Sequence, residues 1–122
     1  MNAKEISIKY CNDVLDGKVI AGNAIKMACR RFLNDLQRDD LDLREEKVDT
    51  LIKLGKCLHH YKRSSANEPF HLESWQVFIA ANIFGWYWKG TNKRRFIQSY
   101  TQIARKNGKT ALNSLFALFA LF

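Results

Sequence analysis

This sequence has a single proline and no long apolar run, and its acidic residues are confined to the first 73 positions. No Asp or Glu follows Glu73, although the chain continues to Phe122. The longest apolar stretch, residues 115–122, is far shorter than the roughly 20 residues that a membrane-spanning helix needs, so we expect no membrane segment. The charged N-terminus, with Lys4 and Glu5, predicts no signal peptide. Three cysteines without a C-x-x-C pair exclude a disulfide framework and predict reduced thiols in a cytoplasmic protein.

Basic residues, by contrast, are plentiful. The 122 residues carry a formal net charge of +8, which favours a polyanionic partner such as nucleic acid. A chain of this length forms one domain at most and can bury a modest core. It is small for an enzyme that hydrolyses nucleotides.

Apolar residues recur at helical spacing in three stretches of the first half, and we predict three short amphipathic helices there. Asp42 and Glu45 have the spacing of a capping box at the start of the third. A polar stretch at residues 64–69 holds the single proline and predicts a boundary between an all-helical segment, residues 1–66, and a second unit, residues 67–122. The apolar stripes are Ile6, Tyr10 and Val14; Ile25, Cys29, Phe32 and Leu36; and Leu51, Leu54, Leu58 and Tyr61.

The second unit changes its pattern twice. Residues 72–84 are helical and strongly apolar, with Gly85 as the expected stop. Residues 96–104 have the aromatic and β-branched content of a strand. Residues 111–122 are apolar on nearly every side of a predicted helix, and such a helix must be enclosed. We therefore expect a truncated core that associates with itself or with a missing part through this helix.

The run Arg105-Lys106-Asn107-Gly108-Lys109-Thr110 joins the predicted strand to the predicted helix. A phosphate-binding loop occupies that place in nucleotide-binding proteins, with its lysine on the β/γ phosphates and its hydroxyl on Mg²⁺. Lys109 and Thr110 would have these roles. The general pattern asks for a glycine where Ile103 stands, so an ordinary basic turn is the alternative from the loop alone.

Several motifs in order resemble the opening of the ATPase domain of tailed-phage terminase large subunits. They are Leu72-x-x-Trp75-Gln76-x-Phe78-Ile79, Phe84-Gly85-Trp86, Arg94-Arg95-Phe96 and Ala104 to Thr110. The family commonly has this variant of the phosphate loop, with a small residue and arginine in place of glycine. The resemblance implies an α/β fold in which a helical segment precedes the first strand, phosphate loop and helix of an ASCE-type P-loop core.

The resemblance also implies roles for individual residues. Lys109 and Arg105 would be catalytic, with Arg105 acting in cis on charge at the γ phosphate; the backbone of residues 106–108 would wrap the phosphates. Thr110 would complete the Mg²⁺ shell, and Gln76 would contact the adenine of ATP. The whole family member would package double-stranded DNA together with a portal protein and a small terminase subunit, and would carry a nuclease domain.

The missing carboxylates limit what this chain can do. Phosphate cleavage needs a carboxylate on Mg²⁺ and usually another that orients water, and none follows the loop. We therefore expect the binding half of a nucleotide site. The alternatives are a small basic nucleic-acid-binding or adaptor protein with an incidental Gly-Lys-Thr, and a helicase-like ATPase that has converged on this start.

Smaller alternatives also stay open. Gln76 could be a polar residue on an exposed helix edge, and Lys93 to Arg95 could either touch DNA or begin a solvated strand. Trp75, Trp86 and Trp88 are expected in the core or at an interface rather than as stacking platforms.

Overall fold

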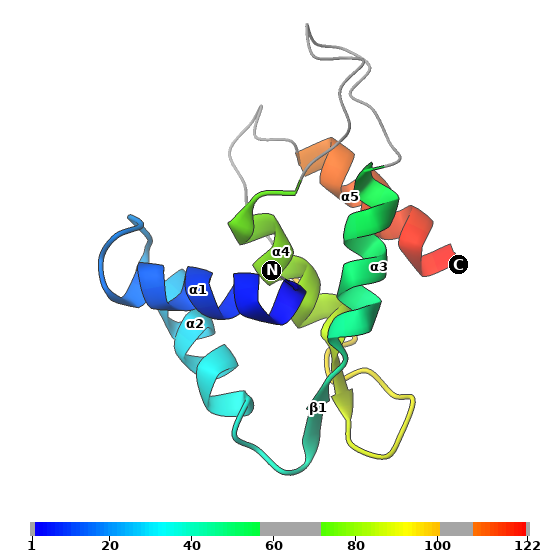
Figure 1. Cartoon of the computed structure of the whole chain (residues 1–122), viewed down its shortest axis with the longest axis horizontal. Coiled ribbons are helices and arrows are strands. Elements are labelled where there is room, and N and C mark those ends of the chain that lie inside the picture. Colours follow the sequence, from blue (N-terminus) through cyan, green and yellow to red (C-terminus); the bar gives the residue numbers. More distant parts are fainter. Residues whose placement is uncertain (1, 57–71, 101–108, 122) are drawn as a thin grey trace, which may run out of the picture.

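The structure, a computed structural model, describes residues 2–56, 72–100 and 109–121. Its elements follow in the order α1 (Ala3–Leu15), α2 (Asn23–Asp35), β1 (Leu41–Leu43), α3 (Glu45–Lys56), α4 (Ser74–Ala80), the π-helix η1 (Ala81–Gly85), β2 (Trp86–Trp88) and α5 (Lys109–Leu121). Figure 1 shows α1 lying across the centre, β1 at one end of the molecule and α5 towards the other. The described part of the chain is therefore mostly helical, with one small two-stranded sheet. The predicted boundary at residues 66–67 lies outside the described residues.

The three predicted helices of the first half are confirmed as α1, α2 and α3. The Asn2 side chain caps α1 by accepting the Glu5 N–H at 2.9 Å, and Gly17 follows the helix with a positive φ of 83°. The stripe residues Val14, Phe32 and Leu51 are fully buried. Amphipathic spacing therefore located the helices and most of their inner faces. The stripe of the second helix is wrong at Ile25, which is 43% exposed, and Leu58 and Tyr61 of the third stripe lie outside the described residues.

The predicted start of the third helix is wrong. Asp42 lies in β1 rather than at a helix cap, and α3 begins at Glu45. β1 pairs antiparallel with β2, in the register Leu41 with Trp88 and Leu43 with Trp86. The sequence did not indicate this sheet because three-residue strands are too short to present a clear alternation. Its effect is to join the helical half to the segment that follows η1.

The helix predicted for residues 72–84 is confirmed as α4 followed directly by η1, and it ends at Gly85 as expected. A Cβ on Gly85 would lie only 2.9 Å from Leu43 Cδ1 and 3.2 Å from Val48 Cγ2. Glycine is needed here because β1 and α3 approach the backbone closely. The turn into β2 is therefore set by packing rather than by a positive φ.

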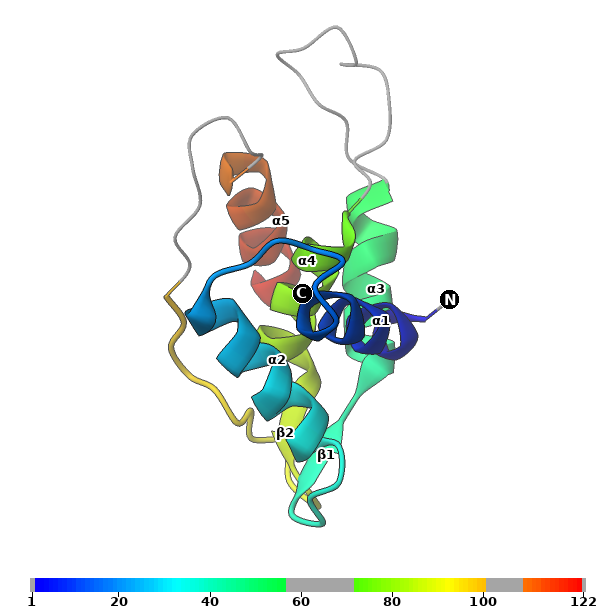
Figure 2. The same cartoon turned by 90° about the vertical axis from the view of Figure 1, so that its left-hand side faces the viewer.

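Aromatic rings from distant parts of the chain form the centre of the core. The Phe32 ring meets those of Phe78 and Trp86 edge to face, each at a centroid distance of 5.5 Å, and Tyr10 lies 5.2 Å from Phe78. The expectation of core tryptophans is confirmed for Trp86, which is 1% exposed, whereas Trp75 is half-buried and Trp88 is exposed. Figure 2 shows α1, α2 and α4 grouped around this centre.

The predicted strand at residues 96–104 is not formed in its described part. Residues 96–100 have no strand assignment, and residues 101–104 lie outside the described residues. An extended segment becomes a strand only when a neighbour accepts its ladder of hydrogen bonds, and the described residues offer none beside 96–100. Ile97 and Tyr100 are accordingly 91% and 88% exposed.

Candidate functional site

The predicted phosphate loop leads into a helix, as expected. Lys109 and Thr110 are the first two residues of α5, and residues 105–108, with Arg105, Lys106, Asn107 and Gly108, lie outside the described residues. The first turn of a helix has backbone N–H groups without intrahelical partners and a partial positive charge. No acidic residue stands in the first turn of α5 to offset that charge. The start of α5 can therefore hold an anion such as a phosphate group.

Helix α5 packs against two elements, α3 and η1. Leu112 and Leu115 are 2% and 0% exposed, and the helix contacts α3. The Phe84 ring of η1 meets those of Phe116 and Phe119 edge to face, at 5.3 and 5.1 Å. The helix is thus only partly enclosed, because Phe116, Leu118 and Phe119 remain half-buried. These contacts place α5 against α3 and η1.

Gln76 has a structural partner within α4. Its side-chain Oε1 accepts the backbone N–H of Glu73 at 2.8 Å, while the Glu73 side chain accepts the N–H of Gln76, which completes a capping box. Gln76 is 5% exposed, so placing it on an exposed helix edge is wrong. The Trp75 Nε1 also donates to Glu73 Oε2, at 2.7 Å. Gln76 therefore stabilises the start of α4 without any ligand, and a contact with adenine stays a prediction.

The two helix starts face the same way. Both views show the first residues of α4 and α5 towards the end of the molecule opposite the small sheet (Figures 1 and 2). Phe84 connects the two helices, since η1 continues α4 and its ring contacts α5. The structure thus brings the starts of α4 and α5 to one end of the molecule.

Within the basic run Lys93 to Arg95, Lys93 and Arg94 are exposed, whereas Arg95 is partly buried. Arg95 Nη1 donates to Asp35 Oδ2 of α2, and the side chains of the two residues are 14% and 7% exposed. The Arg94 guanidinium lies 5.3 Å from the Phe84 ring centroid. Neither alternative for this run, a DNA contact or a solvated strand start, describes Arg95. Sequence reasoning missed Asp35, because nothing in the spacing links residues 60 positions apart.

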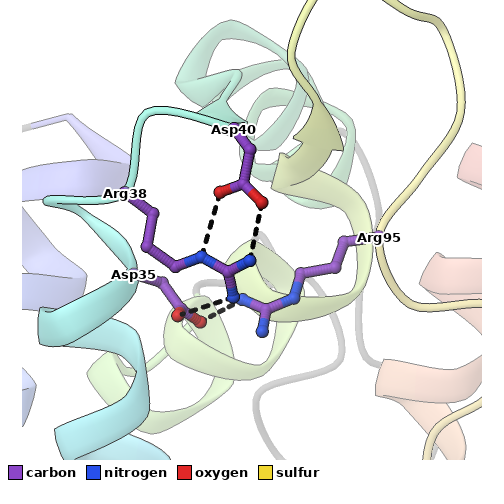
Figure 3. A network of polar contacts seen from close by, with 4 residues as sticks. All are labelled: Asp35, Arg38, Asp40 and Arg95. Carbon is purple, nitrogen blue, oxygen red and sulfur yellow. Dashed lines mark hydrogen bonds and ion pairs between the residues drawn. The ribbon is translucent and has the colours of Figure 1, made fainter.

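Asp35 belongs to a wider polar network (Figure 3). Arg38 Nη1 lies 3.9 Å from Asp35 Oδ1, and Arg38 forks onto both carboxylate oxygens of Asp40, at 3.0 and 2.7 Å. The hydrogen bond from Arg38 lowers the pKa of Asp40 and raises that of Arg38. Arg38 and Asp40 are exposed, so this outer pair contributes little to stability.

A cleft of about 260 Å³ lies between η1 and the segment after β2. Arg94, Gln98 and Ser99 line it together with the apolar residues Ile83, Phe96 and Ile97. Across residues 2–56, 72–100 and 109–121 there is no cluster of three His, Cys, Asp or Glu side chains that could hold a metal. Among the described helices, none is long and apolar enough to cross a bilayer.

Comparisons with known proteins bear on the second half of the chain. The family model described as terminase large subunit, ATPase domain, matches residues 74–122, from the start of α4 through α5. Searches of curated proteins and of solved structures gave no match. The matched residues include Gln76, Arg105, Lys109 and Thr110. Residues 74–122 therefore match the terminase large subunit ATPase domain, the family that their sequence motifs resemble.

Proposed function

We propose that this chain is the N-terminal part of a phage or prophage terminase large subunit, the ATP-driven motor that packages double-stranded DNA. Within it, residues 74–122 would supply the nucleotide-binding half of the ATPase site. One observation carries the proposal: the family match spans both predicted nucleotide motifs. The start of α5 at Lys109 supports it, because a phosphate loop must end at a helix N-terminus.

The proposed roles follow the chemistry of the loop. Lys109 would neutralise the β/γ phosphates, Arg105 would face the γ phosphate, and the backbone of residues 106–108 would surround the phosphate oxygens. Thr110 would hold Mg²⁺ together with those oxygens and water, which suits an ion that keeps much of its water shell. ATP would bring the phosphates that the cationic helix start attracts.

Gln76 would contribute at the adenine end through its amide nitrogen. Its Oε1 is already engaged at the cap of α4, and among the described residues its nitrogen makes no hydrogen bond. An amide N–H can donate to a base nitrogen without disturbing that cap. The capping box would thus hold the amide in place for the base.

The remaining partners would act through the complete motor. They are double-stranded DNA, a portal protein and a small terminase subunit, in the cytoplasm of a bacterial host. Self-association would use the half-buried apolar residues of α5, and sedimentation at high concentration tests it. A clean monomer would contradict that part of the proposal.

Nucleotide binding is the first test. Titration of isotope-labelled chain with Mg²⁺·ATP should shift the amide resonances of Lys109 to Leu112, with an affinity weaker than micromolar, because the site is not fully preorganised. Lys109→Ala should abolish the shifts. Lys93→Ala removes the same charge from an exposed position and should leave them in place. Shifts that persist in Lys109→Ala, or none at millimolar ATP in the unaltered chain, would refute the nucleotide site.

A further inference from the structure

Helix α2 reaches the segment after β2 by two contacts. Asp35 accepts a hydrogen bond from Arg95, and the Arg31 guanidinium lies 4.8 Å from the Phe96 ring centroid. The Arg95 guanidinium is 4.8 Å from the same ring, so Phe96 contacts one arginine of α2 and one of its own segment. These contacts select one placement of residues 95–96 against α2.

The ion pair at the centre of this contact is largely shielded from water. Removing one member of a buried pair leaves an uncompensated charge, so the pair resists rearrangement more than an exposed one. Figure 3 shows Arg95 and Arg38 approaching Asp35 together while Asp40 engages the far side of Arg38. Arg95 is also held by its backbone, whose N–H donates to the Trp86 carbonyl at 3.0 Å.

From Arg95 the backbone leads to Arg94, and contacts between side chains lead from Arg94 to α5. The adjacent Arg94 lies over the Phe84 ring, and Phe84 contacts Phe116 and Phe119. Helix α5 begins at Lys109, and Phe84 and α3 together place the helix through its later turns. Packed side chains of this kind can transmit a displacement between separate sites.

We propose that Asp35 is a positioning residue for the nucleotide site: through Arg95, Arg94 and Phe84 it holds the start of α5 in its binding position. The inference rests on the proposed function. It gives the helical N-terminal half a role in nucleotide binding, although that half contributes no residue to the phosphate loop.

Two variants with the same change of charge test the proposal. Asp35→Asn removes the buried carboxylate, whereas Asp40→Asn removes an exposed carboxylate of the same network. Asp35→Asn should accelerate amide exchange at Arg95 by about tenfold or more, because Arg95 is no longer held against α2. It should also weaken Mg²⁺·ATP binding, followed at the α5 resonances, by about tenfold or more. Asp40→Asn should change the exchange rate of Arg95 and the Mg²⁺·ATP affinity by less than about twofold. Amides of the α1 core, such as that of Val14, should keep their exchange rates in both variants.

A second pair keeps the test decisive if Asp35→Asn fails to fold. Arg94→Gln removes the contact with Phe84 from an exposed position, and Lys93→Gln makes the same charge change beside it. Only Arg94→Gln should weaken nucleotide binding, by about threefold, the scale of an exposed cation–π contact. If the two variants of each pair changed Mg²⁺·ATP binding equally, the positioning role would be overturned, while the proposed nucleotide site would stand. A chain that binds no Mg²⁺·ATP at all would instead refute the proposed function.

Discussion

Gly85 is the residue at which three elements of the fold converge. It ends η1, precedes β2, and its carbonyl accepts the N–H of Arg44 at 2.8 Å at the junction of β1 and α3. The Leu43 and Val48 side chains occupy the space that any larger residue would need. A glycine that looked like a simple helix stop in the sequence is therefore a packing requirement.

Gly85→Ala should destabilise the fold by about 1 to 2 kcal/mol, because the methyl group must push aside Leu43 and the stiffer Val48. Urea unfolding followed by circular dichroism measures the change. Gly22→Ala is the matched control, since nothing lies within 4 Å of its Cβ, and it should cost less than about 1 kcal/mol at the N-cap of α2. Equal losses in the two variants would show that the close approach at Gly85 does not matter.

Cys11 and Cys29 are free thiols, each 0% exposed, at the contact between α1 and α2. Burial raises the pKa of the Cys11 thiol, and the neighbouring Cys29 thiol raises it further. The folded protein therefore keeps Cys11 protonated at pH values where an unfolded chain ionises it.

This shift predicts a loss of stability at alkaline pH. Below the ordinary thiol pKa of about 8.5 both states hold the proton and the group has no pH effect. Above it the unfolded state binds fewer protons than the folded state, so the free energy of unfolding falls as pH rises. Urea unfolding between about pH 7 and pH 10 should show a steeper decline for the unaltered chain than for Cys11→Ala. Parallel declines would contradict the assignment to Cys11.

At the scale of elements, η1 links α4, which it continues, to α5, which its Phe84 ring contacts. Its Phe84 ring packs against two rings of α5, while the rest of η1 contacts α3 and β1. Helix α5 is thus attached by apolar contacts, through Phe84 of η1 and through its contact with α3.

Phe84→Ala should detach α5 selectively. We expect a loss of about 3 kcal/mol, typical of deleting a buried ring, together with faster amide exchange throughout α5. Phe116→Ala removes a half-buried ring of the same cluster and should cost less. The expectation fails if exchange in α5 is unchanged in Phe84→Ala while α1 and α2 loosen.

The elements differ in how far the sequence could predict them. The helices were predictable because their apolar residues recur every three or four positions, and the start of α5 because Gly108-Lys109-Thr110 marks it. The sheet was not, because β1 and β2 are short and lie far apart in the chain. The role of Asp35 was not predictable for a related reason. Its pairing with Arg95 depends on the tertiary fold, and no local sequence pattern indicates it. Gln76 was predicted as a ligand contact, and its capping role became visible only with the geometry of α4.

For the molecule as a whole, the distribution of carboxylates limits the chemistry. Every acidic side chain of the chain lies at or before Glu73, and Asp35, the buried one among the described residues, is engaged by arginines. The chain as given thus has no carboxylate after the proposed phosphate loop to place Mg²⁺ and water for cleavage.

The purified chain should therefore bind Mg²⁺·ATP without turning it over. Phosphate release should match that of Lys109→Ala at all nucleotide concentrations, in the presence and absence of double-stranded DNA. Mg²⁺-dependent turnover that Lys109→Ala abolishes would contradict this expectation and would require a carboxylate from the first 73 residues in the site.

The pairing of β1 with β2 has a consequence for cleavage of the chain. The strand register, the Phe32 contacts and the Asp35–Arg95 ion pair all join residues before 57 to residues after 71. A protease cut between those limits would break one peptide bond and none of these contacts. The two pieces would stay associated in solution and separate only on a denaturing gel, and pieces expressed apart should reconstitute the fold when mixed.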